Sequence, residues 1–322
     1  MSTHEVKVIR IGKIDKHPNA DTLGLTKVDG WNIIVRLSDF KEGDLAAYIE
    51  PDYVVPNTPQ FEFLKGHNRI TVKRFRGIYS QGLLIAAPPN TNEGDNVIDL
   101  LGIKRYEPPI SLSTGGEAEK GPSGFYPKYD VESWQKYKHL LHEGEEVYIT
   151  EKIHGCSARY YFQNGRIYCG SRTEWKREDP KNLWWRCFQQ NPWIEQFCKT
   201  QPTLTVYGEI FGQVQDLKYG AGPNDLFCRV FDLWNTNVNQ WLNIQDAGII
   251  SSYDQLLRWV PSVYKGPYHE DRVLDMAEGN SIIKSTQIRE GIVIKPVIER
   301  MDPEIGRVQL KIVSNKYLER AK

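Results

Sequence analysis

The chain has 322 residues, of which 40% are hydrophobic and 25% are charged. This length favours two domains with separate cores, and this composition excludes a disordered chain. Lysine plus arginine and aspartate plus glutamate both total 41, so the chain has no global positive field and any nucleic-acid site must be a local basic patch.

The first hundred residues contain short alternating runs separated by turn residues. The runs lie at 6–14, 25–28, 32–37, 43–49, 70–75 and 82–87. Alternation of period two indicates strands with one buried face, so we expect a small antiparallel barrel over residues 1–103. Residues 108–124 are rich in Pro, Gly, Ser and Glu, which indicates a linker placed at 104–125.

Residues 126–322 are predicted to form a second domain in which strands and helices alternate irregularly. The expected strands lie at 146–150, 158–162, 166–170, 204–210, 227–234, 291–296 and 308–313. The expected helices, with apolar residues at helical spacing, lie near 131–141, 183–199 and 253–260. The fold class is therefore α+β, with an N-terminal barrel and a C-terminal domain of mostly antiparallel sheet.

The cysteines and the hydropathy pattern bear on the compartment. Five cysteines are scattered with no C-x-x-C pair, which argues against a disulfide framework or a structural zinc site. No apolar stretch approaches the roughly 18 residues that a membrane helix requires. We therefore expect a soluble protein, cytoplasmic or otherwise intracellular, with no membrane partner.

The most informative motif is Glu151-Lys152-Ile153-His154-Gly155, a lysine between a β-rich run and a glycine turn. A lysine is a nucleophile only when its amine is partly neutral, so it needs burial or neighbouring cations. Lys-x-x-Gly alone is weak evidence, because Lys27-Val-Asp-Gly30 also matches it. Lys27, however, lies between two expected barrel strands and has no ordered set of partners close behind it.

Lys152 has such a set, each member on an expected strand or strand end. The set is Ser171-Arg172, Tyr207-Gly208-Glu209, Phe231-Asp232, Glu290-Gly-Ile-Val-Ile-Lys295 and Lys311. This ordered series resembles the six motifs of the covalent nucleotidyltransferase superfamily of polynucleotide ligases and mRNA capping enzymes. Gln309 departs from the family pattern, because the last motif commonly reads Lys-x-Lys.

The resemblance implies a nucleotidyltransferase (adenylation) fold for residues 126–322 and a nucleotide site around Lys152. Lys152 would attack the α-phosphorus of ATP and carry AMP, with Glu151 and Gly155 as neighbouring nucleotide contacts. Arg172 would bind phosphate, since its planar fork matches phosphate oxygens. Glu209 would hold ribose hydroxyls.

The remaining motifs complete this implied site. Adenine would stack between Phe231 and Val293. Glu290 and Glu209 would lie near Mg²⁺ or Mn²⁺, directly or through water. Lys295 and Lys311 would neutralise the α-phosphate, so the implied catalytic residues are Lys152, Glu290, Lys295 and Lys311.

The first barrel resembles an OB-fold, and its Lys16-His-Pro-Asn-Ala-Asp21 loop is similar to that of tRNA-binding barrels. OB barrels bind single strands through stacking and a basic groove. The expected nucleic-acid contacts are Lys73, Arg74 and Arg76 in the barrel and Lys176 and Arg177 in the second domain. A solvated basic surface is the alternative interpretation of these residues.

An OB domain that precedes the catalytic domain resembles a small family of nick-sealing RNA ligases known from a protist and from bacteria. The resemblance implies an ATP-dependent RNA ligase that uses Mg²⁺ or Mn²⁺ and seals 3′-OH/5′-PO4 nicks in duplex RNA or RNA/DNA, with RNA on the 3′-OH side. Lysyl-AMP and an adenylylated 5′-phosphate would be its intermediates.

Other functions are compatible with the same residues. A capping-type guanylyltransferase or a DNA ligase would use the same motifs with another nucleotide or end chemistry. A catalytically inactive tRNA- or nick-binding module would keep the barrel but form no AMP adduct. We expect a monomer, because one chain contains a full candidate catalytic set.

Overall fold

The structure, a computed structural model, describes residues 4–106, 116–243 and 257–320. The chain divides into two compact units. The first contains the described residues of Met1–Pro108 and Ser314–Lys322, and the second contains those of Pro109–Val313. Both units consist mostly of sheet, so the expected α+β class is confirmed. The last residues group with the first unit, which differs from the expected second domain of 126–322.

The first unit is built from short antiparallel strands. They are β1 (Val8–Arg10), β2 (Asp15–Lys16), β3 (Leu23–Val28), β4 (Trp31–Arg36), β5 (Leu45–Ile49), β6 (Tyr53–Val54), β7 (Val72–Phe75), β8 (Ile78–Gln81), β9 (Leu83–Ala86) and β10 (Lys104–Arg105). Their pairing orders are β1-β5-β9, β2-β3-β4, β7-β8 and β10-β6. A 3-10 helix, η1 (Pro59–Leu64), follows β6.

The second lysine motif of the sequence lies in a hairpin of this unit. Val28 pairs with Trp31, so Asp29 and Gly30 form a two-residue turn between β3 and β4. Both turn residues have positive φ angles, 50° and 86°, as a tight hairpin turn requires. The glycine therefore serves the turn, and Lys27 is an exposed strand residue.

Helix α6 (Asn315–Arg320) packs on β7 and completes the first unit. Arg74 Nη2 donates to Glu319 Oε2 at 2.7 Å, and Gln81 Nε2 donates to Asn315 Oδ1 at 3.1 Å. These bonds join residues more than 230 positions apart in the chain. They explain why the C-terminal residues belong with the first unit.

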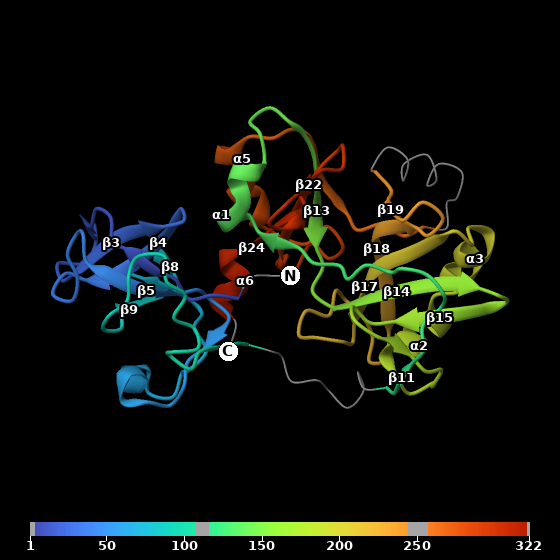
Figure 1. The fold of residues 1–322 in the computed structure, drawn as a ribbon, viewed down its shortest axis with the longest axis horizontal. Helices are drawn as coiled ribbons and strands as arrows, with labels where there is room; N and C mark the ends of the chain where they lie inside the picture. The colour runs from blue at the N-terminus through green and yellow to red at the C-terminus, as the bar shows by residue number, and fades with distance from the viewer. Residues whose placement is uncertain (1–3, 107–115, 244–256, 321–322) are drawn as a thin grey trace. The chain divides into compact units, whose positions relative to one another are not determined.

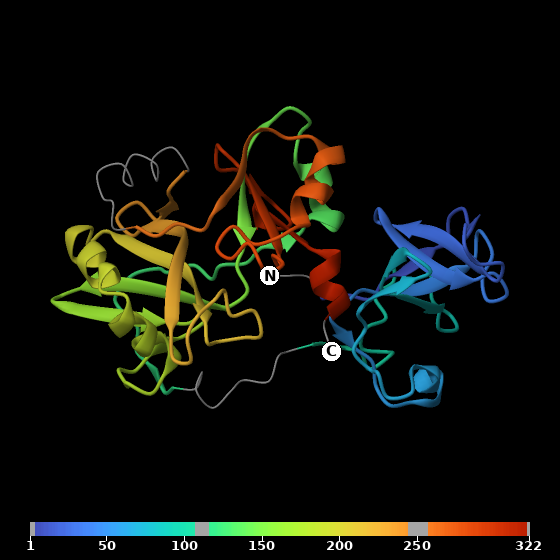
Figure 2. The same cartoon turned by 180° about the vertical axis from the view of Figure 1, so that it is seen from behind.

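The second unit contains two sheets (Figures 1 and 2). The larger sheet has the order β11-β16-β15-β14-β17-β18-β19, and the smaller has the order β12-β24-β21-β13-β20. The larger sheet comprises β11 (Ala118–Glu119), β14 (Cys156–Gln163), β15 (Arg166–Gly170), β16 (Trp175–Lys176), β17 (Leu204–Gly212), β18 (Leu226–Asn235) and β19 (Gln240–Trp241). The smaller comprises β12 (Glu132–Ser133), β13 (Glu146–Lys152), β20 (Ser262–Pro267), β21 (Gly291–Pro296) and β24 (Leu310–Val313).

Helices cover one face of each sheet, as Figure 1 shows. Helices α2 (Leu183–Gln190) and α3 (Trp193–Thr200) pack on the larger sheet. Helices α1 (Trp134–Tyr137) and α5 (Glu270–Ala277) pack on the smaller sheet, and η3 (Lys138–Leu140) follows α1. A hairpin of β22 (Met301–Asp302) and β23 (Gly306–Arg307) joins β21 to β24. Each covered face is an apolar core.

The helix predictions need correction. The helix expected at 183–199 is two helices, because Pro192 has no N–H to donate and cannot continue α2. The helix expected at 131–141 is only the short α1 and η3. Of the helix expected at 253–260, residues 253–256 lie outside the described residues. The remainder is extended, and Trp259 forms a parallel bridge with Val230.

The expected linker is also shorter than 104–125. Residues 107–115 lie outside the described part of the chain, but Ala118–Glu119 pairs with Trp175–Lys176 as the edge strand of the larger sheet. Lys104–Arg105 likewise pairs with β6. Within the described residues, no helix is both long enough and apolar enough to span a membrane.

Candidate active site

The smaller sheet separates core residues from candidate site residues. Ile149, Ile292 and Ile312 are buried in the core shared with α1 and α5. Because strand side chains alternate, the residues between them belong to the opposite face. That face carries four predicted site residues: Lys152 on β13, Val293 and Lys295 on β21, and Lys311 on β24. The structure therefore brings these four together on three neighbouring strands.

The larger sheet contributes Glu209 by the same alternation. Val206 and Ile210 of β17 are buried in the core with α2 and α3, so Glu209 belongs to the opposite face. Gly155 lies against this strand, and a Cβ there would be 2.0 Å from the carbonyl oxygen of Ile210. Only glycine fits at that position, which explains the glycine of the Lys-x-x-Gly motif beside Lys152.

Phe231 comes to the site through a β-bulge. Tyr207 pairs with Asp232, whereas the next residue, Gly208, pairs with Val230. Phe231 is therefore the extra residue on β18, and a bulge of this kind redirects side chains at functional sites. Its half-buried ring packs against Tyr129 at a centroid distance of 4.4 Å. The bulge is visible only in the pairing of β17 with β18 and could not be predicted from the sequence pattern.

Lys152 is held by a carboxylate. Its Nζ donates to Glu290 Oε1 at 2.6 Å, with 27% of the lysine side chain exposed. Burial alone would raise the pKa of Glu290, but the neighbouring Lys152 and His154 outweigh it and lower that pKa to about 2. An anionic partner stabilises the ammonium form, so Lys152 must leave Glu290 before it can act as a nucleophile.

Glu209 has the opposite electrostatic character. Burial raises the pKa of Glu209 to about 8, despite the opposing charge of Lys152, and Glu290 adds to the rise. Two carboxylates near one lysine thus differ strongly in charge at neutral pH. Such paired, oppositely shifted groups are typical of functional sites.

These carboxylates also fit a divalent cation. Glu290 Oε2 is buried without a hydrogen-bond partner, and His154 Nδ1 lies 3.7 Å away, beyond hydrogen-bond distance. Magnesium and manganese favour carboxylate oxygens and retain waters. Among the described side chains, no three His, Cys, Asp or Glu are grouped to hold a metal by themselves. Glu290, together with Glu209 once Glu209 has lost its proton, therefore fits a cation that is partly hydrated or bound with a substrate phosphate.

Glu151 is placed differently from its neighbour Lys152. Its side chain is buried, and its Oε2 accepts a hydrogen bond from the backbone N–H of Ile282 at 2.7 Å. Burial raises the pKa of Glu151. Because strand side chains alternate, Glu151 lies on the face opposite Lys152. There it binds the loop that contains Ile282 and leads to Glu290.

Arg172 is held by an acidic residue that the sequence did not single out. Its Nη2 lies 2.8 Å from Asp130 Oδ1, and 46% of its side chain is exposed. The backbone oxygen of Asp130 accepts a hydrogen bond from Gln309 Nε2 at 2.5 Å. Gln309, at the position where the family commonly has a lysine, is buried. Its amide therefore holds the backbone of Asp130 in place.

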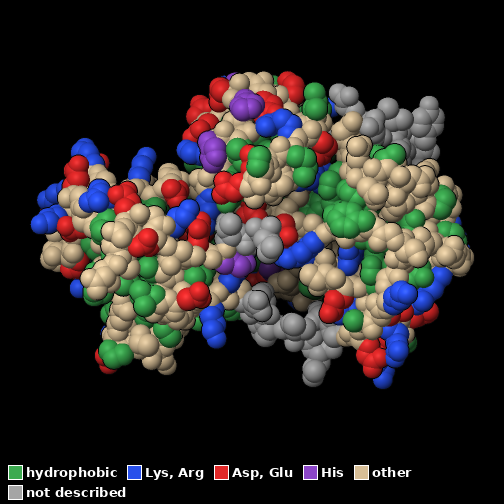
Figure 3. All heavy atoms as spheres, viewed as in Figure 1, with side chains coloured by type: hydrophobic (Ala, Val, Ile, Leu, Met, Phe, Trp, Pro, Cys, Tyr) green, Lys and Arg blue, Asp and Glu red, His purple; other side chains and the backbone are tan. Residues whose placement is uncertain are grey.

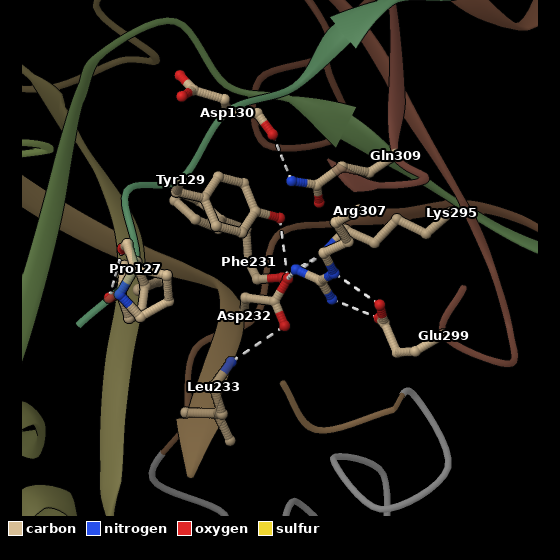
Figure 4. A network of polar contacts seen from close by, with 11 residues as sticks. Pro127, Tyr129, Asp130, Phe231, Asp232, Leu233, Lys295, Glu299, Arg307 and Gln309 are labelled. Carbon is tan, nitrogen blue, oxygen red and sulfur yellow. Dashed lines mark hydrogen bonds and ion pairs between the residues drawn. The ribbon is translucent and has the colours of Figure 1, made fainter. Parts of the chain in front are cut away.

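Lys295 lies in a buried polar cluster, shown in Figure 4. Its Nζ donates to Asp232 Oδ2 at 2.7 Å and to the backbone oxygen of Phe231 at 2.9 Å. Arg307 Nη1 donates to the same Asp232 oxygen at 2.5 Å. The expected contact with the α-phosphate would require Lys295 to leave both acceptors. Sequence reasoning missed Tyr129, Glu299 and Arg307 in this cluster, and no motif marks them.

The basic residues expected to contact nucleic acid divide into two groups. Lys73, Arg74 and Arg76 are exposed around β7, and the Arg74 guanidinium lies 4.6 Å from the ring centroid of Tyr79. Arg177 is also exposed. Lys176, by contrast, is buried and donates to Gly116 O at 3.2 Å and Glu174 Oε2 at 2.7 Å, so it holds the β11 segment. Figure 3 shows basic and acidic side chains interspersed on one face, as the balanced charge predicts.

Comparisons with known proteins match both units. A family model described as RNA ligase matches residues 145–313, and an OB-fold domain model matches residues 5–87. The N-terminal barrel is therefore an OB-fold, as predicted. A search of curated proteins finds no match.

Solved structures match nearly the whole chain. A variant of a Naegleria gruberi RNA ligase with ATP and manganese is 25% identical, with a TM-score of 0.82 over 99% of each chain. Another variant of that ligase, with AMP and manganese, is 26% identical, with a TM-score of 0.81 over 98% of each chain. The ligase with pyrophosphate gives the same three values.

Proposed function

The chain belongs to the RNA ligase family, and we propose that it uses ATP to seal 3′-OH/5′-PO4 nicks in duplexes whose 3′-OH strand is RNA. The observation that carries this proposal is the position of Lys152 in contact with Glu290 and near Glu209, on a face shared with Val293 and Lys311. The similar Naegleria ligase has structures with ATP, AMP and pyrophosphate. These are the substrate, the transferred group and the leaving group of lysine adenylylation.

In the first step, the Lys152 amine attacks the α-phosphorus of ATP. A P–N bond forms, the bond to the β-phosphate oxygen breaks, and pyrophosphate leaves with that electron pair. Glu290 is a weak base because its pKa is about 2. We therefore assign it to holding the Lys152 side chain in the site, and the amine proton leaves to solvent once that ion pair opens.

The second and third steps transfer AMP and join the ends. An oxygen of the RNA 5′-phosphate attacks the α-phosphorus, the P–N bond breaks, and Lys152 regains its amine. The 3′-hydroxyl then attacks the 5′-phosphate, loses its proton, and releases AMP. A bound Mg²⁺ or Mn²⁺, held by Glu209 and Glu290 directly or through water, supplies neutralisation of phosphate charge.

Other residues bind and orient the substrates. Arg172 exchanges Asp130 for a phosphate, because the two groups offer its guanidinium similar oxygen acceptors. Phe231 and Val293 hold adenine between the two sheets, with Gly155 near the nucleoside. Glu151, on the opposite face of its strand, supports the loop before Glu290 instead of contacting the nucleotide. Lys311, in register with Val293, neutralises the α-phosphate.

The nucleic-acid partner is a nicked duplex, RNA or RNA/DNA. Lys73, Arg74, Arg76 and Arg177 are exposed and suit phosphate contacts. We propose a monomer that acts in the cytoplasm or another intracellular compartment, since every residue assigned to the nucleotide site lies in one unit of one chain.

Labelling with ATP carrying a radioactive α-phosphate tests this function. The chain is first treated with pyrophosphate to remove preformed AMP, then incubated with labelled ATP and Mg²⁺ without RNA. We expect an acid-labile adduct on the peptide that contains Lys152. Lys152→Ala abolishes it, whereas Lys27→Ala, at the other Lys-x-x-Gly motif, leaves it unchanged.

The outcomes separate the alternatives. Labelling from GTP in preference to ATP would indicate a capping-type enzyme. An adduct followed by sealing of DNA 3′-OH ends alone would indicate a DNA ligase. No adduct from either nucleotide would contradict the proposal and favour an inactive nucleic-acid-binding module.

A further inference from the structure

A buried ionic cluster joins the two sheets of the second unit beside Phe231. Asp232 belongs to β18 of the larger sheet, Lys295 to β21 of the smaller sheet, and Arg307 to the β22–β23 hairpin. Their side chains are 6%, 8% and 7% exposed, respectively. Charges buried to this degree need close partners, so the cluster must be held in one arrangement.

Asp232 is the shared acceptor of the cluster. Its Oδ2 accepts from Tyr129 Oη at 2.9 Å, Lys295 Nζ at 2.7 Å and Arg307 Nη1 at 2.5 Å. Burial alone would raise the pKa of Asp232, but Arg307 and then Lys295 outweigh it, and that pKa is lowered. The carboxylate therefore stays ionised and tightly bound.

Arg307 has a geometry that lysine could not provide. One edge of its guanidinium meets Asp232, and its Nε and Nη2 meet the carboxylate of Glu299, as Figure 4 shows. The guanidinium carbon also lies 4.6 Å from the ring centroid of Trp241. A planar fork can satisfy two carboxylates at once, whereas an ammonium is a point charge.

The cluster acts directly on the bulge that carries Phe231. Lys295 Nζ binds the backbone oxygen of Phe231 as well as the side chain of Asp232, the next residue. The same lysine lies two residues after Val293 on β21, so both belong to one face of that strand. The cluster therefore connects Phe231 on one sheet to the strand of Val293 on the other.

We propose that Arg307 is a positioning residue for the nucleotide base: by holding Asp232 together with Lys295, it fixes the bulge that presents Phe231. The inference rests on the proposed nucleotide site, in which Phe231 and Val293 enclose adenine. Arg307 itself does not touch the nucleotide. Its loss weakens binding of the base while leaving binding of the sugar phosphate intact.

Equilibrium binding of two ligands measures this effect without catalysis. AMP contains the base, and ribose 5-phosphate lacks it. On chain stripped with pyrophosphate, Arg307→Met weakens AMP binding about tenfold, an effect that one base–aromatic stack can account for. It changes ribose 5-phosphate binding less than about twofold, within the usual scatter of independent sites.

A double-mutant cycle shows whether Arg307 acts through Phe231. Phe231→Leu removes the ring, so adding Arg307→Met to it causes less than about a twofold further change in AMP binding. The matched control is Arg300→Met. Arg300 binds Glu145 Oε1 at 2.8 Å and the Leu140 carbonyl at 2.7 Å, and it makes no contact with Asp232. AMP binding by this control is unchanged.

Arg307→Lys is a second variant in case Arg307→Met misfolds. It keeps the positive charge but loses the planar guanidinium that meets both Asp232 and Glu299. Intermediate weakening of AMP binding by this variant supports the proposal. Equal weakening for both ligands, full additivity with Phe231→Leu, or absence of AMP binding by the unmodified chain overturns it. AMP binding without an adduct at Lys152 would contradict the ligase function alone and leave the role of Arg307 intact.

Discussion

Lys152 and Lys295 lie on neighbouring strands of one sheet and differ in almost every physical respect. Lys152 has 27% of its side chain exposed and pairs with Glu290. Lys295 has 8% exposed and binds a carboxylate that Arg307 also holds. Sequence motifs give both lysines a role at the α-phosphate. In our proposal, Lys152 therefore forms the bond to AMP, and Lys295 holds the backbone that carries Phe231.

The largest contrast comes from removing the acidic partner of each lysine. Asp232→Asn leaves Lys295 buried without a counter-charge and leaves Arg307 with Glu299 alone, so the free energy of unfolding falls by about 3–5 kcal/mol. Glu290→Gln leaves a lysine that water can reach, and the loss is smaller, about 1–2 kcal/mol, because only the charge-assisted hydrogen bond of Lys152 is lost. Urea denaturation measures both. Equal losses would erase the proposed difference between the two lysines.

Removing the lysines themselves gives a smaller contrast. Lys295→Met deprives Asp232 of one of its two cations while Arg307 remains, so we expect a stability loss of about 2 kcal/mol. Lys152→Met leaves Glu290 beside His154 with water access through the site, so stability falls by about 1 kcal/mol, but the AMP adduct is abolished. Thermal unfolding and labelling of the same preparations check this. A stable Lys295→Met variant would show that the cluster does not need its lysine.

The smallest effect, taken per pH unit, concerns Glu209, whose pKa of about 8 lies above the ordinary value of 4.5. A raised carboxyl pKa stabilises the fold fully below pH 4.5, and this stabilisation is lost as the pH rises towards 8. Stability of the unmodified chain, relative to Glu209→Gln, should therefore fall by about 1 kcal/mol for each pH unit between these two values. The measurement is urea denaturation in metal-free buffer. A difference that is flat with pH would contradict the assigned environment.

The sequence predicted those features that depend on local pattern and order. The strands expected at 146–150, 291–296 and 308–313 correspond to β13, β21 and β24, which carry Lys152, Val293 and Lys311. The hairpin turn at Asp29-Gly30 explains the competing motif at Lys27. The OB-fold and the RNA ligase family also followed from the sequence.

The features that sequence missed depend on tertiary pairing. The bulge at Phe231 exists only in the register between β17 and β18. Arg307 and Asp130 are ordinary charged residues until the fold places them beside Asp232 and Arg172. Helix α6 joins the first unit through contacts to residues far away in the chain. The break at Pro192, in contrast, is visible in the sequence. The helical spacing of apolar residues over 183–199 nevertheless predicted one continuous helix where the structure has two.

The most direct test of the difference between the two lysines is the rate of adduct formation by Lys295→Met at saturating ATP, measured in a single turnover at a temperature where the variant is folded. If Lys295 positions Phe231, the maximal rate stays within about tenfold of the unmodified chain, while the ATP concentration for half-maximal rate rises. If Lys295 contacts the α-phosphate during transfer, the maximal rate falls by more than about a thousandfold with that concentration unchanged, and our account is contradicted.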